Sequence, residues 1–131
     1  MLVLDTSGLL AALDRRDRHH RRAVDHVGGD PGPYVVPVPI LAEVTYMIAA
    51  RLGPAVLDAF LADLEVGAFT LDCGEGDIAR ARELVHRYGS LPLGFADAAV
   101  VACAERTRAP VLTFDVRDFG VVAREGTITL A

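Results

Sequence analysis

Acidic side chains occur where strands are expected to end or apolar helices to begin. Asp5 follows the apolar run 2–4, and Asp115 follows the apolar run 110–114. Glu43 and Asp97 each lie in the first turn of an apolar segment with helical character. In open α/β sheets, ligands bind beyond the carboxyl ends of the strands, at the edge where the following helices begin. We therefore expect all four carboxylates to converge.

Converging carboxylates require a cation, because neighbouring strands lie only about 5 Å apart and like charges at that spacing repel strongly. Oxygen ligands favour hard divalent ions, so Mg²⁺ or Mn²⁺ is expected at this edge. Such ions lower the pKa of a bound water, hold a phosphate and stabilise a leaving oxygen. The pattern therefore predicts phosphodiester hydrolysis without a protein nucleophile.

The acids that follow strands also have structural explanations. Asp5, together with Thr6 and Ser7, could cap the helix that follows. Asp115 could begin a turn, and Asp118 is a nearby alternative that we rank below it. Each of these explanations accounts for its own acid alone.

The acids on helices have structural explanations as well. Glu43 could stabilise a helix dipole, but its apolar neighbours predict that it is buried and needs a partner. Asp97 could have the same dipole role, yet it is the only charged residue between positions 88 and 105. Independent capping of so many helices at one sheet edge is the less economical explanation, so a shared acidic site is preferred.

The elements that position these residues alternate between strand-like and helical patterns. Strands are expected at 2–4, 34–38, 68–71, 110–114 and 127–130. Helices are expected directly after Ser7 and at 40–52, 54–64, 75–88 and 95–105. Parallel strands need crossover connections, so the pattern predicts a three-layer α/β fold with a mostly parallel sheet. The segment 40–52 is apolar nearly all round, which predicts a buried helix.

Composition and length are those of one ordinary globular domain spanning residues 1–131, with 52% hydrophobic and 24% charged residues. No apolar run approaches the roughly 20 residues that cross a bilayer. The first residues lack a secretory signal, so a cytoplasmic protein without membrane association is expected. Cys73 and Cys103 lack metal-binding spacing, and we expect reduced, buried thiols rather than a disulfide.

The type, number and location of the charged residues limit the possible functions. All 13 basic residues are arginine, which rules out any mechanism that needs a Schiff-base or phosphate-loop lysine. The net charge of −5 disfavours a non-specific grip on nucleic acid but permits a nuclease whose acidity is local and neutralised by metal. The segment 14–22 contains five arginines and no apolar residue. This segment could bind RNA phosphates, but we prefer the interpretation that it is a solvent-exposed surface.

These residues also carry a family resemblance. Val3-Leu-Asp5-Thr-Ser7, Ala42-Glu43, Phe95-Ala-Asp97-Ala and Leu112-Thr-Phe-Asp115 resemble the successive acidic motifs of PIN-domain nucleases, particularly VapC-type toxins. The resemblance extends from end to end of the chain. It includes His19 and His20 after the first helix, and Asp118-Phe119 near the end.

The resemblance implies a fold and an activity. The sheet would have the order 3-2-1-4-5, with Asp5 and Asp115 at adjacent strand ends. The activity would be that of a Mg²⁺- or Mn²⁺-dependent endoribonuclease, with Asp5 and Asp97 as the principal metal ligands. The remaining two acids would complete the pocket or position water, and Thr6 or Ser7 would support the ligands.

The resemblance also implies partners. VapC-like proteins dimerise and are held inactive by a VapB-like antitoxin, whose C-terminal segment covers the groove and directs a basic side chain at the acids. An RNA substrate, a homodimer and an antitoxin encoded by a neighbouring gene are therefore expected. Val116 departs from the family, because many relatives carry a basic residue directly after the fourth acid, whereas Arg117 is retained.

Two other functions are compatible with the same residues. A PIN-like scaffold could bind RNA or an antitoxin without cutting. A phosphatase could use Asp5 as its nucleophile, as an acid at the end of the first strand suits aspartyl-phosphate chemistry. The second aspartate expected two residues later in such a phosphatase is Ser7 here, which counts against it.

Overall fold

A four-stranded parallel sheet in the order β3-β2-β1-β4 forms the centre of the fold. The computed structural model describes residues 1–91 and 93–131, so Pro92 lies outside the described residues. The strands are β1 (Leu2–Leu4), β2 (Tyr34–Pro37), β3 (Thr70–Asp72) and β4 (Val111–Leu112). The parallel sheet and the order of these strands confirm the expected topology.

The fifth strand expected at 127–130 does not form. Leu130 makes only an isolated parallel bridge with Val111, supported by hydrogen bonds from Val111 N to Thr129 O (2.9 Å) and from Ala131 N to Val111 O (2.9 Å). Because β4 is itself only two residues long, it offers too little backbone for a longer ladder. The C-terminal segment nevertheless lies beside β4, where a fifth strand would be.

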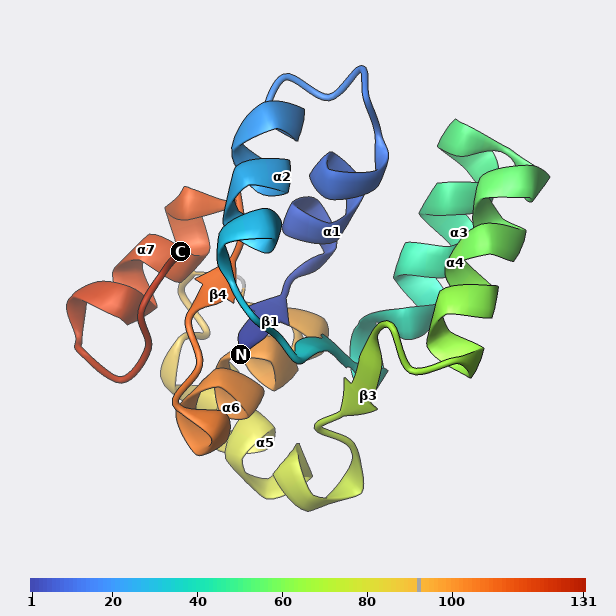
Figure 1. The fold of residues 1–131 in the computed structure, drawn as a ribbon. Helices are drawn as coiled ribbons and strands as arrows, with labels where there is room; N and C mark the ends of the chain where they lie inside the picture. The colour runs from blue at the N-terminus through green and yellow to red at the C-terminus, as the bar shows by residue number, and fades with distance from the viewer. Residues whose placement is uncertain (92) are drawn as a thin grey trace.

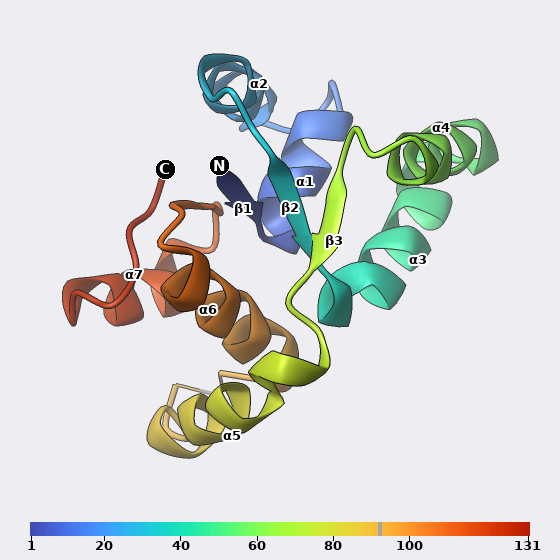
Figure 2. The same ribbon diagram turned by 60° about the horizontal axis from the view of Figure 1, so that its bottom comes forward.

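Helices cover both faces of the sheet. Figure 2 shows α1 and α2 on one side and α5, α6 and α7 on the other, which confirms the expected three-layer arrangement. A hairpin of α3 and α4 extends from the β3 edge (Figure 1). The helices are α1 (Thr6–Leu13), α2 (His20–Gly29), α3 (Leu41–Leu52), α4 (Pro54–Glu65), α5 (Ile78–Arg87), α6 (Phe95–Thr107) and α7 (Val116–Arg124), with short 3₁₀ turns η1 (Val38–Ile40) and η2 (Glu75–Asp77).

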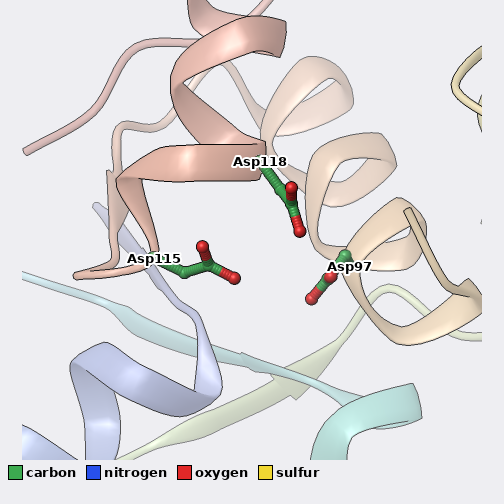
Figure 3. A group of neighbouring side chains, drawn as sticks. All are labelled: Asp97, Asp115 and Asp118. Atoms are coloured by element: carbon green, nitrogen blue, oxygen red, sulfur yellow. The ribbon is translucent and has the colours of Figure 1, made fainter. Parts of the chain in front are cut away.

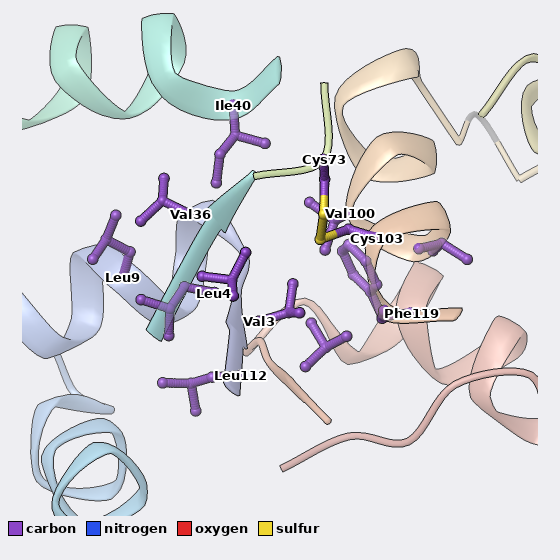
Figure 4. Packing of buried hydrophobic residues seen from close by; sticks show 14 of the residues in the cluster. Val3, Leu4, Leu9, Val36, Ile40, Cys73, Val100, Cys103, Leu112 and Phe119 are labelled. Carbon is purple, nitrogen blue, oxygen red and sulfur yellow. A yellow bond between two sulfur atoms is a disulfide. The ribbon is translucent and has the colours of Figure 1, made fainter. Parts of the chain in front are cut away.

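The core lies on both faces of β1. Side chains alternate across a strand, so Leu4 faces Leu9 of α1, whereas Val3 faces the side formed by α6 and α7 (Figure 4). In α6, every residue from 98 to 104 is buried. Phe119 and Val122 anchor α7, an amphipathic helix that the strand and helix patterns did not predict. None of the helices in the described ranges combines the length and hydropathy that a membrane crossing requires.

The expectation that residues 40–52 form a buried helix is wrong. In α3, only Val44 and Ile48, one helical turn apart, are buried, and Tyr46 is 75% exposed. Three further apolar residues pack against the core while partly exposed, namely Leu41, Met47 and Leu52. Glu43 was likewise expected to be buried and is exposed. The reason is that α3 packs mainly on α4 and projects beyond the sheet, so one side of the helix faces solvent.

The expectation of reduced thiols is also wrong. Cys73, directly after β3, and Cys103 in α6 form a disulfide, although 30 positions separate them in sequence. Their Cα atoms lie 5.3 Å apart because the chain crosses over from β3 to α6 through α5. Spacing in the sequence does not reveal this proximity. Both cysteines are buried. The disulfide joins the end of β3, at the edge of the sheet, to α6.

Candidate active site

Asp5 is held at the junction of β1 and α1, directly beyond the carboxyl end of the central strand. It occupies the N-cap position, but its carboxylate makes no capping hydrogen bond. Instead, its Oδ2 accepts hydrogen bonds from Thr113 Oγ1 (2.9 Å) and Ser7 Oγ (3.1 Å). The side chain is 4% exposed, and this burial raises the pKa of Asp5 above its ordinary value.

Two hydroxyls join this junction to the segment between β4 and α7. Ser7 Oγ and Thr113 Oγ1 lie 3.1 Å apart, within hydrogen-bond distance. Ser7 Oγ accepts from Phe114 N (2.9 Å), and Thr113 Oγ1 accepts from Asp115 N (3.0 Å). The network therefore fixes Asp5 and Asp115 relative to each other. In the sequence, the only indication of a role for Thr113 is its place in the Leu-Thr-Phe-Asp motif.

The carboxylates of Asp97, Asp115 and Asp118 face one another (Figure 3), with one ligand atom from each lying within 4.8 Å of the others. Asp97 comes from the first turn of α6, Asp115 precedes α7, and Asp118 lies in the first turn of α7. Asp115 makes no side-chain capping hydrogen bond, and α6 likewise has none at its start. Asp118 thus joins Asp115 rather than replacing it.

The acids repel one another. Burial, followed by the charges of Asp5, Asp115, Asp118 and Glu43, raises the pKa of Asp97 to about 7. Within residues 1–91 and 93–131, none of these carboxylates forms an ion pair with an arginine, a histidine or the N-terminus. The group therefore carries negative charge that no described cationic side chain pairs.

A cavity of about 260 Å³ opens beside these acids, and all four carboxylates expected from the sequence line it. Thr6 and Ser7 line it as well. Arg117 is exposed and is not among the lining residues. The lining residues are Asp5, Thr6, Ser7, Leu10, Asp17, His19, Glu43, Met47, Arg51, Asp97, Phe114 and Asp115.

Several lining residues were missed. Asp17 and His19 belong to the segment 14–22, whose arginines are exposed as expected for a solvated face. The rings of His19 and Phe114 stack with centroids 4.4 Å apart and an interplanar angle of 1°. Arg51, in the last turn of α3, reaches the cavity from the opposite element. Because no periodicity links these segments, only the fold shows that they meet.

The donor set at this site suits a hard divalent cation. Its ligand atoms are carboxylate oxygens, which Mg²⁺ and Mn²⁺ prefer, and no thiol or imidazole is among the three clustered residues. Bringing these acids together raises the pKa of Asp97, and a bound cation would offset the repulsion that causes the rise. The residues present therefore fit a divalent metal.

Sequence comparison places the chain. Residues 2–125 match the PIN domain model. The chain belongs to the PIN-domain family. Ribonuclease VapC26 of Mycobacterium tuberculosis is 34% identical to this PIN domain over 123 residues, which cover 92% of this chain and 91% of the relative. This PIN domain is therefore a member of the VapC group.

Solved structures share the fold of this PIN domain. VapC20 of Mycobacterium tuberculosis, described as a toxin that cleaves the sarcin-ricin loop, has a TM-score of 0.81 at 20% identity and covers 93% of this chain and 95% of its own. DNA-bound VapBC of Salmonella typhimurium has a TM-score of 0.66 at 18% identity, covering 99% of this chain and 96% of its own. FitAcB of Neisseria gonorrhoeae has a TM-score of 0.65 with the same identity and coverages, 18%, 99% and 96%.

Proposed function

We propose that this PIN domain is a metal-dependent endoribonuclease of the VapC type, which hydrolyses RNA phosphodiesters at the acidic cavity. The observation that carries the proposal is the cluster of Asp97, Asp115 and Asp118 within 4.8 Å, beside a cavity also lined by Asp5 and Glu43. Identity to a ribonuclease along nearly the whole chain supports it. The match over residues 2–125 and the continuous hydrophobic core support treating residues 1–131 as one domain.

The proposed cofactor is Mg²⁺ or Mn²⁺, held by Asp5, Asp97, Asp115 and Asp118. When bound, such an ion supplies Lewis-acid activation of a water molecule and neutralises charge on the scissile phosphate. Asp5 contributes a fixed carboxylate, since Ser7 and Thr113 hold one of its oxygens.

Glu43 has a different proposed role. It lines the cavity from α3 and is exposed, and it lies outside the clustered ligand group. A carboxylate at the edge of the cavity can orient the attacking water and accept its proton. We therefore assign Glu43 to positioning water, and Asp5 with the three clustered aspartates to holding the cofactor.

The proposed partners follow from the VapC group. A VapB-like antitoxin would inhibit the enzyme, in line with the VapBC and FitAcB assemblies that share its fold. A basic side chain of that antitoxin would find unpaired carboxylates in the cavity. We further propose a homodimer that acts in the cytoplasm, where its RNA substrate is found. Co-expression with the product of the neighbouring gene should yield a complex without nuclease activity.

The decisive experiment compares the wild type with Asp97→Asn after induced expression in a bacterial host, followed by end-mapping of cellular RNAs. Growth arrest with discrete cuts is expected only for the wild type. Asp58→Asn, on the exposed surface of α4, is the matched control and should cut like the wild type. RNA profiles without discrete cuts for both the wild type and Asp97→Asn would favour the non-cutting scaffold. Persistent cutting by Asp97→Asn would contradict the assigned site.

A further inference from the structure

Two aromatic rings from distant segments form one stacked surface at the cavity. His19 precedes α2 and Phe114 lies between β4 and α7, and both line the cavity that Asp97 and Asp115 also line. Their planes are parallel within 1°, with centroids 4.4 Å apart. The guanidinium carbon of Arg22 lies 5.3 Å from the Phe114 centroid. We call His19, Phe114 and Arg22 the aromatic stack.

Hydrogen bonds hold the aromatic stack in place before any ligand arrives. His19 N donates to Asp17 Oδ1 (2.8 Å), and Phe114 N donates to Ser7 Oγ (2.9 Å). The ring of the next residue, His20, bonds Ala11 O of α1 through Nδ1 (2.8 Å). These bonds fix the segments that carry the two rings, so a ligand that stacks on the rings loses little by ordering them.

The surroundings of the stack are basic, although the protein as a whole is acidic. Five of the 13 arginines lie in 14–22, and none of the five forms an ion pair with a carboxylate in the described residues. The two aspartates among them are engaged elsewhere, since Asp14 accepts from Arg16 N and Asp17 from His19 N. Arg18 Nε donates to His19 Nε2 (3.2 Å) and Arg22 lies over Phe114, so the guanidinium groups of Arg15, Arg16 and Arg21 are the ones available to an external anion.

From these contacts we infer that the aromatic stack is a subsite for an unpaired nucleobase of the RNA, next to the scissile phosphate, while the neighbouring arginines bind flanking phosphates. The inference rests on the proposed function, because it takes the acidic cavity as the site of cleavage. Stacking rings flanked by cations match a ligand that carries both aromatic bases and phosphates. A basic protein segment would place its cations against these arginines.

The subsite predicts a preference for single-stranded or looped RNA. A base within a duplex has both faces covered by its neighbours, so it cannot stack on His19 without leaving the helix. Stacking is tolerant of sequence because every base has an aromatic face. The stack should therefore position a base beside the cut without specifying its identity.

Binding measurements test the subsite directly. The probes are single-stranded octaribonucleotides of mixed sequence, each with one 2-aminopurine, added in EDTA to protein carrying Asp97→Asn. Because stacking does not select the base, added quenching of 2-aminopurine on binding is expected at more than one position of the probe. His19→Ala in the same background should abolish it and weaken binding roughly 10-fold, whereas His19→Phe should keep both. His86→Ala, an exposed histidine of α5, is the matched control and should bind like the parent.

A cleavage assay separates the subsite from the proposed function. With Asp97 intact and Mn²⁺ present, His19→Ala should raise KM for a cleaved RNA by roughly 10-fold and change kcat much less. Normal cleavage by His19→Ala, or equal binding of His19→Ala and parent, overturns the subsite and leaves the nuclease standing. Quenching that depends on His19 in a protein that cuts no RNA overturns the nuclease and leaves base binding standing. Equal binding of duplex and single strands overturns the subsite.

Discussion

At the residue scale, Asp97 opposes folding of the metal-free chain when it is ionised. The pKa of its carboxyl is raised from 3.8 to about 7, so the native state binds this proton more tightly than the unfolded chain does. The associated stability is complete below about pH 4 and is lost as the pH rises towards 7. Asp97→Asn removes this dependence. In EDTA near pH 8, we expect its Tm to exceed that of the wild type by about 3 °C.

The way in which the Tm difference between Asp97→Asn and the wild type depends on pH and on metal identifies its cause. The difference should shrink towards about pH 4.5, where the wild-type carboxyl is largely protonated. Saturating Mn²⁺ should stabilise the wild type more than Asp97→Asn, because binding to the native state adds stability. Scanning fluorimetry across pH, with Asp58→Asn as the control for a lost surface charge, measures both effects. A Tm difference that is constant with pH would contradict the electrostatic explanation.

Thr113 is expected to set the strength of metal binding without being a ligand. Its hydroxyl bonds both the Asp5 carboxylate (2.9 Å) and the backbone N of Asp115 (3.0 Å). Thr113→Val keeps the shape but leaves these groups less well oriented, so Mn²⁺ affinity should fall about 10-fold, the lower end for outer-shell partners. Calorimetric titration of Mn²⁺ measures it. The control is Thr107→Val, which removes an ordinary helical bond to Cys103 O (2.8 Å) and should leave affinity unchanged.

At the element scale, the contact between α1 and β4 depends on the absence of a side chain at Gly8. A Cβ there would lie 2.1 Å from the backbone oxygen of Leu112, which cannot move without shifting β4. Gly8→Ala should destabilise the fold by about 3 kcal/mol. It should also weaken Mn²⁺ binding, since Asp5 N donates to that same oxygen (3.1 Å). Urea unfolding measures the first effect, and calorimetric titration measures the second.

A second glycine provides the control for this change. Gly28 lies in α2, and a Cβ there would have nothing within 4 Å. Gly28→Ala should therefore stabilise the protein slightly, by about 0.5 kcal/mol, because alanine favours helix more than glycine does. If Gly8→Ala unfolds at the same urea concentration as the wild type, the close approach of α1 to β4 does not limit stability.

The elements that the sequence predicted well are those whose pattern is local. The run before Asp5 is apolar and ends in polar residues, so β1 and the start of α1 could be inferred directly. Whether residues 127–130 form a strand depends on the length of β4. The exposure of α3 depends on how far this helix projects beyond the sheet. Those are tertiary properties, which an apolar pattern cannot record.

The candidate site likewise contains residues that a local pattern indicates and residues that only the tertiary structure brings together. Asp5, Glu43, Asp97 and Asp115 could be predicted because each lies at a strand end or in a first helical turn, and parallel topology brings such positions to one edge. Convergence of all four on the cavity agrees with that reasoning. His19 had no such signal, because its place beside Phe114 depends on the path of an irregular loop.

At the scale of the whole molecule, the disulfide ties the β3 edge to α6, the helix that carries Asp97. Arg106 of α6 reinforces the same connection through ion pairs with Asp77 (2.9 Å) and Asp72 (3.2 Å). The two kinds of contact act differently. The disulfide limits the unfolded chain by closing a loop across 30 positions, whereas the ion pairs exist only in the folded state.

Removing the disulfide should therefore lower stability more than activity. Loop closure of this length contributes about 3.6 kcal/mol, so reduction or the double change Cys73→Ala with Cys103→Ala should lower the urea midpoint markedly. RNA cleavage at low temperature should persist, because the ion pairs of Arg106 still hold the β3 edge against α6. The double variant should be insensitive to dithiothreitol, which separates the disulfide from other effects of reductant. Two alkylatable thiols in protein purified in air, or a urea midpoint unchanged by reduction, would show that the link does not stabilise this PIN domain.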